Sequence, residues 1–231
     1  SSAASDVYKR QVVKSLITFL LLVHFLSAST FVKAKVQLPS ILSSNMVLQQ
    51  HTNVKLWGKA QKNSPITIKT SWDNKTYKTI ADKQGKWLLN ISTPVAGGPY
   101  EITFNDGELL TLKNILIGEV WFCSGQSNME FYLNWSATAA QDVPQAANSN
   151  IRLYDMKARW RTDAVEWDAS VLDSLNHLQY YKDTRWTVCS PETAGNFSAV
   201  AYYFGKKLQD SLQVPVGLIC NAIGGSPTEA W

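Results

Sequence analysis

The sequence predicts an α/β protein in which a small N-terminal antiparallel β-sandwich precedes a three-layer α/β/α domain that is incomplete at the C-terminus of this chain. Three observations lead to this prediction. Between residues 36 and 114, short β-type segments alternate with turn residues. The stretch Leu110–Cys123 ends in a nearly continuous apolar run, which is typical of a strand covered on both faces. Beyond Ser136, helical and strand patterns alternate.

The composition is that of a globular chain with one large or two small domains. Its 231 residues are 45% hydrophobic and 17% charged. The net charge of +4 is mild and scattered along the sequence, which argues against a nucleic-acid partner. The nine Trp and nine Tyr residues either fill the core or line a sugar site, and the core is the simpler interpretation.

The three cysteines are too few for a disulfide framework. Cys123 and Cys220 each end a predicted core strand, so we interpret them as small buried thiols. The sequence has no Cys-x-x-Cys or His-x-x-x-His spacing, so we expect neither a metal site nor another cofactor.

The first 34 residues are typical of a leader that precedes the folded domains. Residues 1–11 carry no core pattern and no starting Met, so we exclude them as foreign or mistranslated sequence. The apolar run over 15–26 is shorter than the roughly 20 residues that a membrane helix needs. It is followed by Val32 and Ala34, small residues at signal-peptidase spacing.

These features predict a signal peptide over about 12–34 and a mature start at Lys35. The mature chain is then expected in the periplasm or outside the cell, with no stable membrane association. The alternative is that the apolar run is a membrane anchor or an amphipathic first helix.

Residues 35–114 are predicted to form the β-sandwich domain. Five segments in it alternate or cluster apolar and β-branched residues: Val54–Gly58, Ile66–Thr70, Tyr77–Ile80, Trp87–Ile91 and Tyr100–Phe104. Turn residues rich in Gly, Asn, Asp and Pro separate them. Short strands at near-regular spacing are typical of a small antiparallel sandwich.

Residues 115–231 are predicted to form the α/β domain. After the strand ending at Cys123, the expected elements are a helix over 136–148, a strand over 151–156, a helix over 197–212 and a strand over 214–220. Residues 157–195 are irregular and are expected to form a long surface insertion. The apolar stripe of the second helix is expected to face the core; it consists of Val200, Tyr203, Phe204, Leu208 and Leu212.

The stretch Gly118–Glu130 is the strongest candidate for a site. It is predicted to run as a strand into a tight polar turn that presents Ser127 at the start of a helix. Open α/β sheets bind ligands at the carboxyl ends of their strands, and a helix N-terminus there offers N–H donors to a developing oxyanion. A structural alternative exists, because Ser127 and Glu130 also match the Ser-x-x-Glu capping box.

At this stretch the sequence resembles the sialate O-acetylesterase family, in the SGNH (GDSL-like) hydrolase superfamily. Residues 118–130, Gly-Glu-Val-Trp-Phe-Cys-Ser-Gly-Gln-Ser-Asn-Met-Glu, are similar to the first block of that family. The tail Val216–Trp231, which contains Gly-Gly-Ser and ends in Trp, is similar to its later Gly-Gly block. Shorter similarities in the β-type segments extend the resemblance over nearly all of 36–231.

The resemblance implies a serine esterase that removes O-acetyl groups from sialic acids or related sugars and needs no cofactor. Ser127 would be the nucleophile, and its own N–H with donors near Gln126 and Gly224–Gly225 would hold the oxyanion. The structural alternative for the two glycines is a plain strand-to-helix turn. For Glu130 we prefer a bracing role at the turn over a part in the chemistry.

A serine hydroxyl needs a base to act as a nucleophile at neutral pH, and the family places its Asp-x-x-His pair well after the Gly-Gly block. The three histidines here, His24, His51 and His177, do not fit that place. Asp173 and His177 are one residue too far apart and precede the glycines. We therefore expect the base beyond Trp231, and this polypeptide alone to be nearly inactive, with a loss on the order of 10⁶ in rate.

Two other classes of function stay open. The chain could be a carbohydrate-binding protein that uses its sandwich and surface aromatics without hydrolysis, or a structural or assembly module. A downstream Asp-x-x-His favours the esterase, whereas sugar binding that survives Ser127→Ala favours the binding protein. The sequence does not choose between sialic acid and plant-polysaccharide acetyl esters, and it predicts no oligomeric state.

Overall fold

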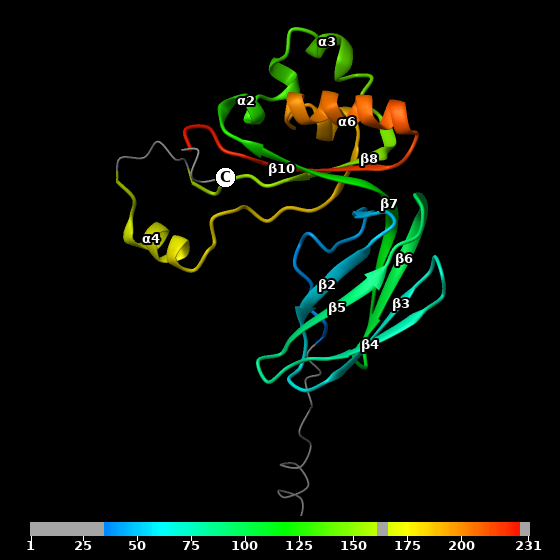
Figure 1. Cartoon of the computed structure of the whole chain (residues 1–231). Coiled ribbons are helices and arrows are strands. Elements are labelled where there is room, and N and C mark those ends of the chain that lie inside the picture. The colour runs from blue at the N-terminus through cyan, green and yellow to red at the C-terminus, as the bar shows by residue number, and fades with distance from the viewer. Residues whose placement is uncertain (1–34, 161–165, 227–231) are drawn as a thin grey trace, which may run out of the picture. The chain divides into compact units, whose positions relative to one another are not determined.

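Strands dominate the part of the chain that the computed structural model describes, residues 35–160 and 166–226 (Figure 1). The predicted leader and its cleavage site lie outside these residues. The fold is mixed α/β, with one sheet of eight strands, a second sheet of two strands, and one helix of substantial length. By its internal contacts, the chain from Lys35 onwards forms one unit.

The antiparallel strands confirm the five segments predicted from the sequence. They are β2 (Asn53–Lys59), β3 (Pro65–Thr70), β4 (Thr76–Ile80), β5 (Lys86–Ser92) and β6 (Gly97–Asn105). Strands β4, β3 and β6 are neighbours in the larger sheet, while β2 and β5 form the two-stranded sheet. Alternate residues are buried, as in Ile66 and Ile68 of β3, because successive side chains point to opposite faces of a strand.

One long strand, β7 (Leu109–Gly125), runs through the larger sheet. Its first part pairs with β6 in antiparallel orientation. Leu116–Gly118 pair in parallel with the short β1 (Val47–Gln49), and residues 119–125 pair in parallel with β10 (Val216–Ala222). The boundary predicted between residues 114 and 115 falls inside this strand, and the division into two domains stays a prediction.

The parallel part of the sheet has the order β7, β10, β8, where β8 spans Asn148–Asp155. The short β9 (Thr187–Cys189) adds to the other edge of β8 in antiparallel orientation. The strands predicted over 151–156 and 214–220 are therefore confirmed. Their side chains are mostly buried, as a strand covered on both faces requires.

Helix α6 (Ala199–Leu212) confirms the helix predicted over 197–212. Its N-cap is Ser198, whose hydroxyl accepts a hydrogen bond from the N–H of Ala201. The orientation predicted for it is wrong, because most of the predicted apolar stripe is exposed: Val200, Tyr203, Phe204 and Leu212. The helix instead lays its small residues on the sheet, where Gly205 lies against Leu218 of β10.

The remaining helices are short. They are α2 (Ser127–Glu130), the 3-10 turn η1 (Leu133–Trp135), α3 (Ala139–Asp142), α4 (Ala169–Asn176) and α5 (Pro191–Ala194). The helix predicted over 136–148 is wrong except for α3, because Pro144 has no N–H to continue it and Asn148 already begins β8. No helix among the described residues is long and apolar enough to cross a membrane.

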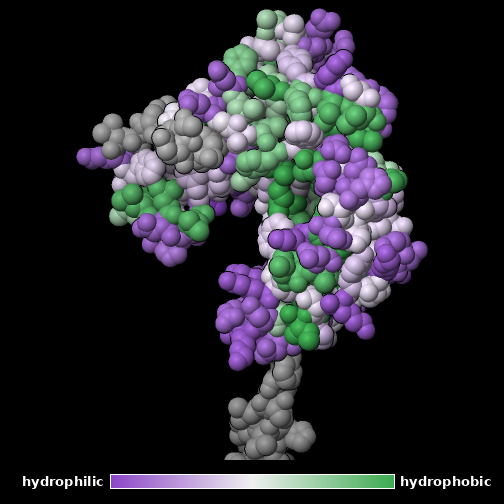
Figure 2. Space-filling model, in the orientation of Figure 1, coloured by the Kyte–Doolittle hydropathy of each residue, from purple (hydrophilic) through white to green (hydrophobic). Residues whose placement is uncertain are grey.

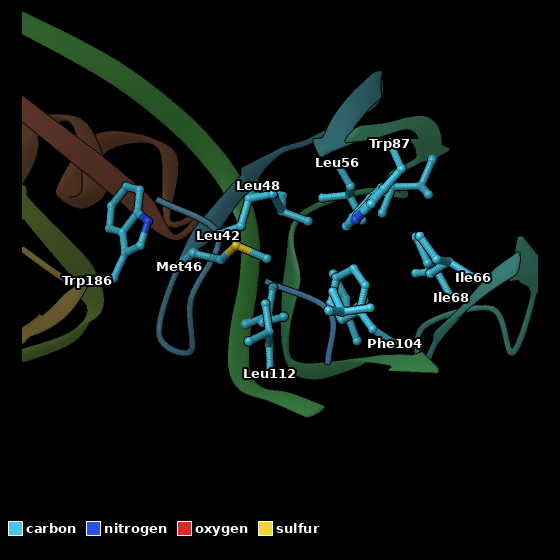
Figure 3. Packing of buried hydrophobic residues seen from close by; sticks show 14 of the residues in the cluster. Leu42, Met46, Leu48, Leu56, Ile66, Ile68, Trp87, Phe104, Leu112 and Trp186 are labelled. Atoms are coloured by element: carbon cyan, nitrogen blue, oxygen red, sulfur yellow. The ribbon is translucent and has the colours of Figure 1, made fainter. Parts of the chain in front are cut away.

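Two clusters of buried side chains form the core. In the first, Leu56 and Trp87 of the two-stranded sheet pack against Ile66, Ile68 and Phe104 of the larger sheet (Figure 3). The ring centroids of Trp87 and Phe104 are 5.9 Å apart. This cluster holds the antiparallel strands together.

The second cluster surrounds β10 and includes Tyr202 of α6 and all three cysteines. The cysteines are free and buried, which confirms the prediction for Cys123 and Cys220. Burial raises the pKa of the Cys220 thiol to about 12. These thiols are therefore packing groups, because only the thiolate is a reactive nucleophile.

Candidate active site

Ser127 lies at the carboxyl end of β7, on the turn into α2. Gly125 has a φ of 151°, which side chains disfavour, and it lets the chain pass at once from strand to helix. Gln126 is the N-cap of α2 and makes no side-chain capping bond. Ser127 is therefore the first helical residue and is exposed. The capping box that offered its hydroxyl a structural role is not formed.

Glu130 has a partner far away in the sequence. Its Oε2 accepts a hydrogen bond from the backbone N–H of Gly224, with 2.6 Å between nitrogen and oxygen. A bond to an ionised acceptor is stronger than one between neutral groups. It ties α2 to the turn that follows β10, the contact that a bracing role for Glu130 needs.

The two predicted motifs meet because their strands are neighbours in register. The last residues of β7 and β10, Gly125 and Ala222, are paired. Just beyond the pair, the N–H of Ile223 donates to the carbonyl oxygen of Gly125 at 3.0 Å. Figure 1 shows α2 close to the end of β10 as a result.

The turn after β10 approaches Ser127 closely because Gly224 has no side chain. A methyl group built on Gly224 would lie 3.4 Å from Ser127 Oγ and 2.8 Å from Glu130 Oε2. The next residue, Gly225, has a φ of 81°, a conformation that favours glycine. The Gly-Gly pair is thus required by the geometry of this turn.

A hollow of about 660 Å³ opens beside the turn. Glu130, Tyr132, Ile223, Gly224 and Gly225 line one part of it; the rest is lined by Lys157, Ala158, Arg159, Trp160 and Lys182. Three of these side chains are cationic and Glu130 is anionic; Lys157 pairs with Asp155, and Arg159 pairs with Asp183. The volume of the hollow is in the range of small-molecule sites, roughly 300–1,000 Å³.

Asp155 and Lys157 form an ion pair close to this hollow, with 3.1 Å between Oδ2 and Nζ. Burial raises the pKa of Asp155, Lys157 opposes that shift, and the nearby Glu130 adds to it. Burial acts to lower the pKa of Lys157, but Asp155 and, to a smaller extent, Tyr132 outweigh this effect, and the pKa is raised. Neither residue was predicted as a site residue, although both lie at the end of a core strand, where α/β proteins often bind ligands.

The residues predicted for the site occupy one place in the structure. Ser127 Oγ lies where a methyl group on Gly224 would meet it at 3.4 Å. Gly224 and Gly225 line the hollow, whereas Gln126 and Ser127 are not among its lining residues. Gln126 is exposed, and its carbonyl oxygen accepts a hydrogen bond from the N–H of Glu130 at 2.9 Å. These contacts give the positions of the residues, while their chemical roles stay predictions.

The histidines lie elsewhere. His177 follows α4, is exposed, and has its Nδ1 3.5 Å from Asp173 Oδ1. His51 is exposed in the turn before β2, and His24 lies outside the described residues. Within residues 35–160 and 166–226, no histidine lines the hollow, and no group of three His, Cys, Asp or Glu side chains could hold a metal ion.

Comparison with known proteins finds two kinds of relative, although no family model matches the chain. The sialate O-acetylesterase of Rattus norvegicus is 30% identical over 211 residues, which cover 83% of this chain and 36% of that protein. The sialate O-acetylesterase of Homo sapiens is 26% identical over 208 residues, which cover 83% of this chain and 38% of that protein.

Among solved structures, a carbohydrate acetylesterase from Xanthomonas citri superposes with a TM-score of 0.73 at 31% sequence identity. The match covers 85% of this chain and 42% of that one. The chain thus spans between a third and a half of the length of these relatives.

Proposed function

Because this chain belongs to the sialate O-acetylesterase family, we propose that it is the part of a carbohydrate O-acetylesterase that carries the nucleophile, Ser127. The proposal rests above all on one observation. An exposed serine at a strand end lies beside Gly224, in a turn that borders a hollow large enough for a sugar. A free hydroxyl next to backbone donors is the arrangement that acyl transfer requires.

In the proposed reaction, Ser127 Oγ attacks the carbonyl carbon of the acetyl ester. The carbon–oxygen bond to the sugar breaks, the sugar hydroxyl leaves with a proton, and water then hydrolyses the acetyl-serine. We assign the oxyanion to the N–H of Ser127, the side chain of Gln126 and the Gly224–Gly225 turn. One such donor is worth about 2.7–4 kcal/mol in the transition state.

The hydrogen bond to Glu130 refines this assignment. Since the N–H of Gly224 donates to Glu130, the donor that the turn offers to an oxyanion is the N–H of Gly225. Glu130 then fixes the turn without taking part in the chemistry. We propose that the base which activates Ser127 comes from outside the described residues, consistent with the positions of His51 and His177.

The substrate that we propose is an acetyl ester on a sialic acid or a related glycan. The ammonium and guanidinium groups of Lys157, Arg159 and Lys182 line the hollow and supply hydrogen-bond donors for the carboxylate and hydroxyls of such a sugar. We further propose an N-terminal β-sandwich followed by an SGNH-like domain, and a secreted or periplasmic protein after removal of a signal peptide over about 12–34.

A second candidate function rests on the antiparallel strands. A hollow of about 750 Å³ there is lined by three exposed apolar residues, Trp57, Ile80 and Leu88, together with the charged Lys59, Asp82 and Lys86. An exposed indole beside polar groups can hold the apolar face of a sugar. This favours a non-catalytic, secreted carbohydrate-binding protein as the alternative.

Chemical rescue tests the nucleophile. The 231-residue chain is given a 9-O-acetylated sialic acid, and acetate release is followed with and without added imidazole. Without imidazole we expect almost no turnover. Imidazole supplies a base from solution, so we expect it to raise the rate at least about tenfold, part of the roughly 10²–10⁴-fold that a positioned base contributes.

The control is Ser127→Ala at the same imidazole concentration, because imidazole itself cleaves esters slowly. The proposal expects this variant to fall to the rate of imidazole without protein. Equal rates for the two chains would show that Ser127 is not the nucleophile. Fast turnover without imidazole would show that the chain already contains its base.

A further inference from the structure

We propose that Phe131, Tyr132 and Trp135 form a glycan platform, which holds the sugar residue next to the one whose acetyl group reaches Ser127. The ligand is thus an oligosaccharide or glycoconjugate rather than a single sugar. This inference rests on the proposed function, since it places the platform along the same substrate. It follows from the geometry of three aromatic rings directly after α2.

The rings form one continuous group. Trp135 lies over Tyr132, with centroids 4.4 Å apart and 36° between the planes. Phe131 meets Trp135 edge-on at 5.8 Å. Trp135 is 61% exposed and Phe131 is 40% exposed, while Tyr132 is partly buried. Core packing therefore does not account for Trp135.

The backbone beneath the rings is firmly held. The N–H of Leu133 donates to the carbonyl oxygen of Phe197 at 3.0 Å, and that of Ala199 donates to Phe131 at 2.8 Å. Leu133 itself is fully buried in the second core cluster. The exposed rings are therefore fixed in position before any ligand arrives, which lowers the entropy lost on binding.

The platform is continuous with the proposed substrate site. Tyr132 lines the hollow beside Glu130 and Gly224, and Trp135 extends the aromatic surface away from it. Lys157 Nζ lies 4.7 Å from the centroid of the Tyr132 ring. A chain of sugars that begins in the hollow at Tyr132 therefore meets Trp135 next.

The chemistry of the surroundings suits a sugar better than an apolar peptide. A pyranose ring presents C–H groups to an aromatic face and hydroxyls around its edge. Polar groups adjoin the rings: Asn134 Nδ2 donates to Asn196 Oδ1 at 3.1 Å, and Lys157 Nζ donates to the carbonyl oxygen of Asn196 at 3.0 Å. Hydrophobic residues also reach the surface over α6 (Figure 2).

Binding measurements test the platform without relying on hydrolysis. The 231-residue chain is titrated by calorimetry with 3′-sialyllactose, a trisaccharide, and with methyl sialoside, a single sugar. We expect the trisaccharide to bind about tenfold more tightly, the factor that one stacking contact contributes. Trp135→Ala should remove this difference and leave the affinity for the methyl sialoside unchanged. Trp135→Phe should keep part of it.

The matched control is Trp121→Ala, which removes an exposed tryptophan from β7. It should change neither affinity. The platform is overturned if both ligands bind equally, if Trp135→Ala weakens both alike, if Trp57→Ala in the alternative sugar site abolishes binding, or if neither sugar binds. Thermal unfolding of each variant checks that the fold is intact. The imidazole experiment tests the esterase proposal independently, so that proposal can hold even if the platform proposal is wrong.

Discussion

The two clusters of buried residues are built from different side chains. In the first, which joins β3, β5 and β6, one of the seventeen buried residues is Ala and none is Cys. In the second, around β10 and α6, eight of the fifteen are Ala or Cys. Small side chains let α6 approach the sheet closely at Gly205. The second region is therefore packed through close approach of its elements rather than through large side chains.

Polar side chains act both within a turn and between distant segments. In the first region, Asp82 Oδ1 accepts hydrogen bonds from the N–H groups of Gln84 and Lys86 at 2.8 Å within its own turn. In the second, Glu130 reaches Gly224 in the turn that follows β10. Long-range polar contacts at strand ends bring together groups that a local turn cannot, and this is where the candidate site lies.

Gly118→Ala should have the largest effect on stability, because Gly118 lies in β7 where the two regions join. A methyl group there overlaps the carbonyl oxygen of Pro215, which accepts the hydrogen bond from Glu119 that starts the β7–β10 pairing. We expect a loss of about 3 kcal/mol in the free energy of unfolding, the upper end of the usual cost of overpacking. Amide hydrogen exchange should accelerate in β10 and much less in β3.

Gly205→Ala is the matched control for that experiment. Its methyl group meets only side-chain atoms of Leu218, which can shift, so the loss should be smaller, about 1–2 kcal/mol. If Gly118→Ala accelerated exchange equally in β3 and β10, the two regions would unfold as one unit. Their different packing would then cause no difference in local stability.

Glu130→Ala should have an intermediate effect, because it removes the bond between α2 and the turn after β10. A hydrogen bond to a charged group contributes about 1.5–3 kcal/mol, and we expect a loss in this range on urea unfolding. Exchange of the Gly224 amide should accelerate in parallel. Glu108→Ala provides the contrast in the first region: its ion pair with Lys35 is half exposed and should cost under about 1 kcal/mol.

Ser127→Ala should have the smallest effect on stability, within about 0.5 kcal/mol, as for surface positions generally. The reason is that its exposed hydroxyl caps no helix. Ser198→Ala is the fitting comparison, since its hydroxyl does cap α6 and its loss should cost about 0.5–2 kcal/mol. If Ser127→Ala and Ser198→Ala lowered the stability equally in thermal denaturation, Ser127 would have a structural role.

Sequence reasoning predicted the strands well because their signal is local. Alternation and turn residues identify β2 to β6, and a continuous apolar run identifies β7. Ser127 and the Gly-Gly pair were predicted as site residues from motif and resemblance. Their contact depends on β7 and β10 being parallel neighbours, with Gly125 opposite Ala222. No local pattern encodes which strand lies beside which.

The orientation of α6 shows why the packing of the helix was not predicted from the sequence. Its large apolar residues, such as Phe204, gave the clearest periodic signal, yet they are exposed. The face that packs carries Ala201, Gly205 and the buried Gln209, which contribute little to a hydrophobic pattern. The buried face of α6 is the one whose small residues allow close approach to the sheet, not the most hydrophobic one. The strand that it packs against, β10, lies later in the chain.

The unbroken course of β7 constrains how this molecule can be cut or recombined. Side chains alternate between the faces of a strand, so inserting or deleting a single residue midway would turn every following side chain to the opposite face. Cys123 would then leave its cluster, and the carboxyl end that carries Ser127 would move one step past Ala222. A graft of the part that carries the candidate site onto another β scaffold must therefore begin before Leu109 and preserve the length of this strand.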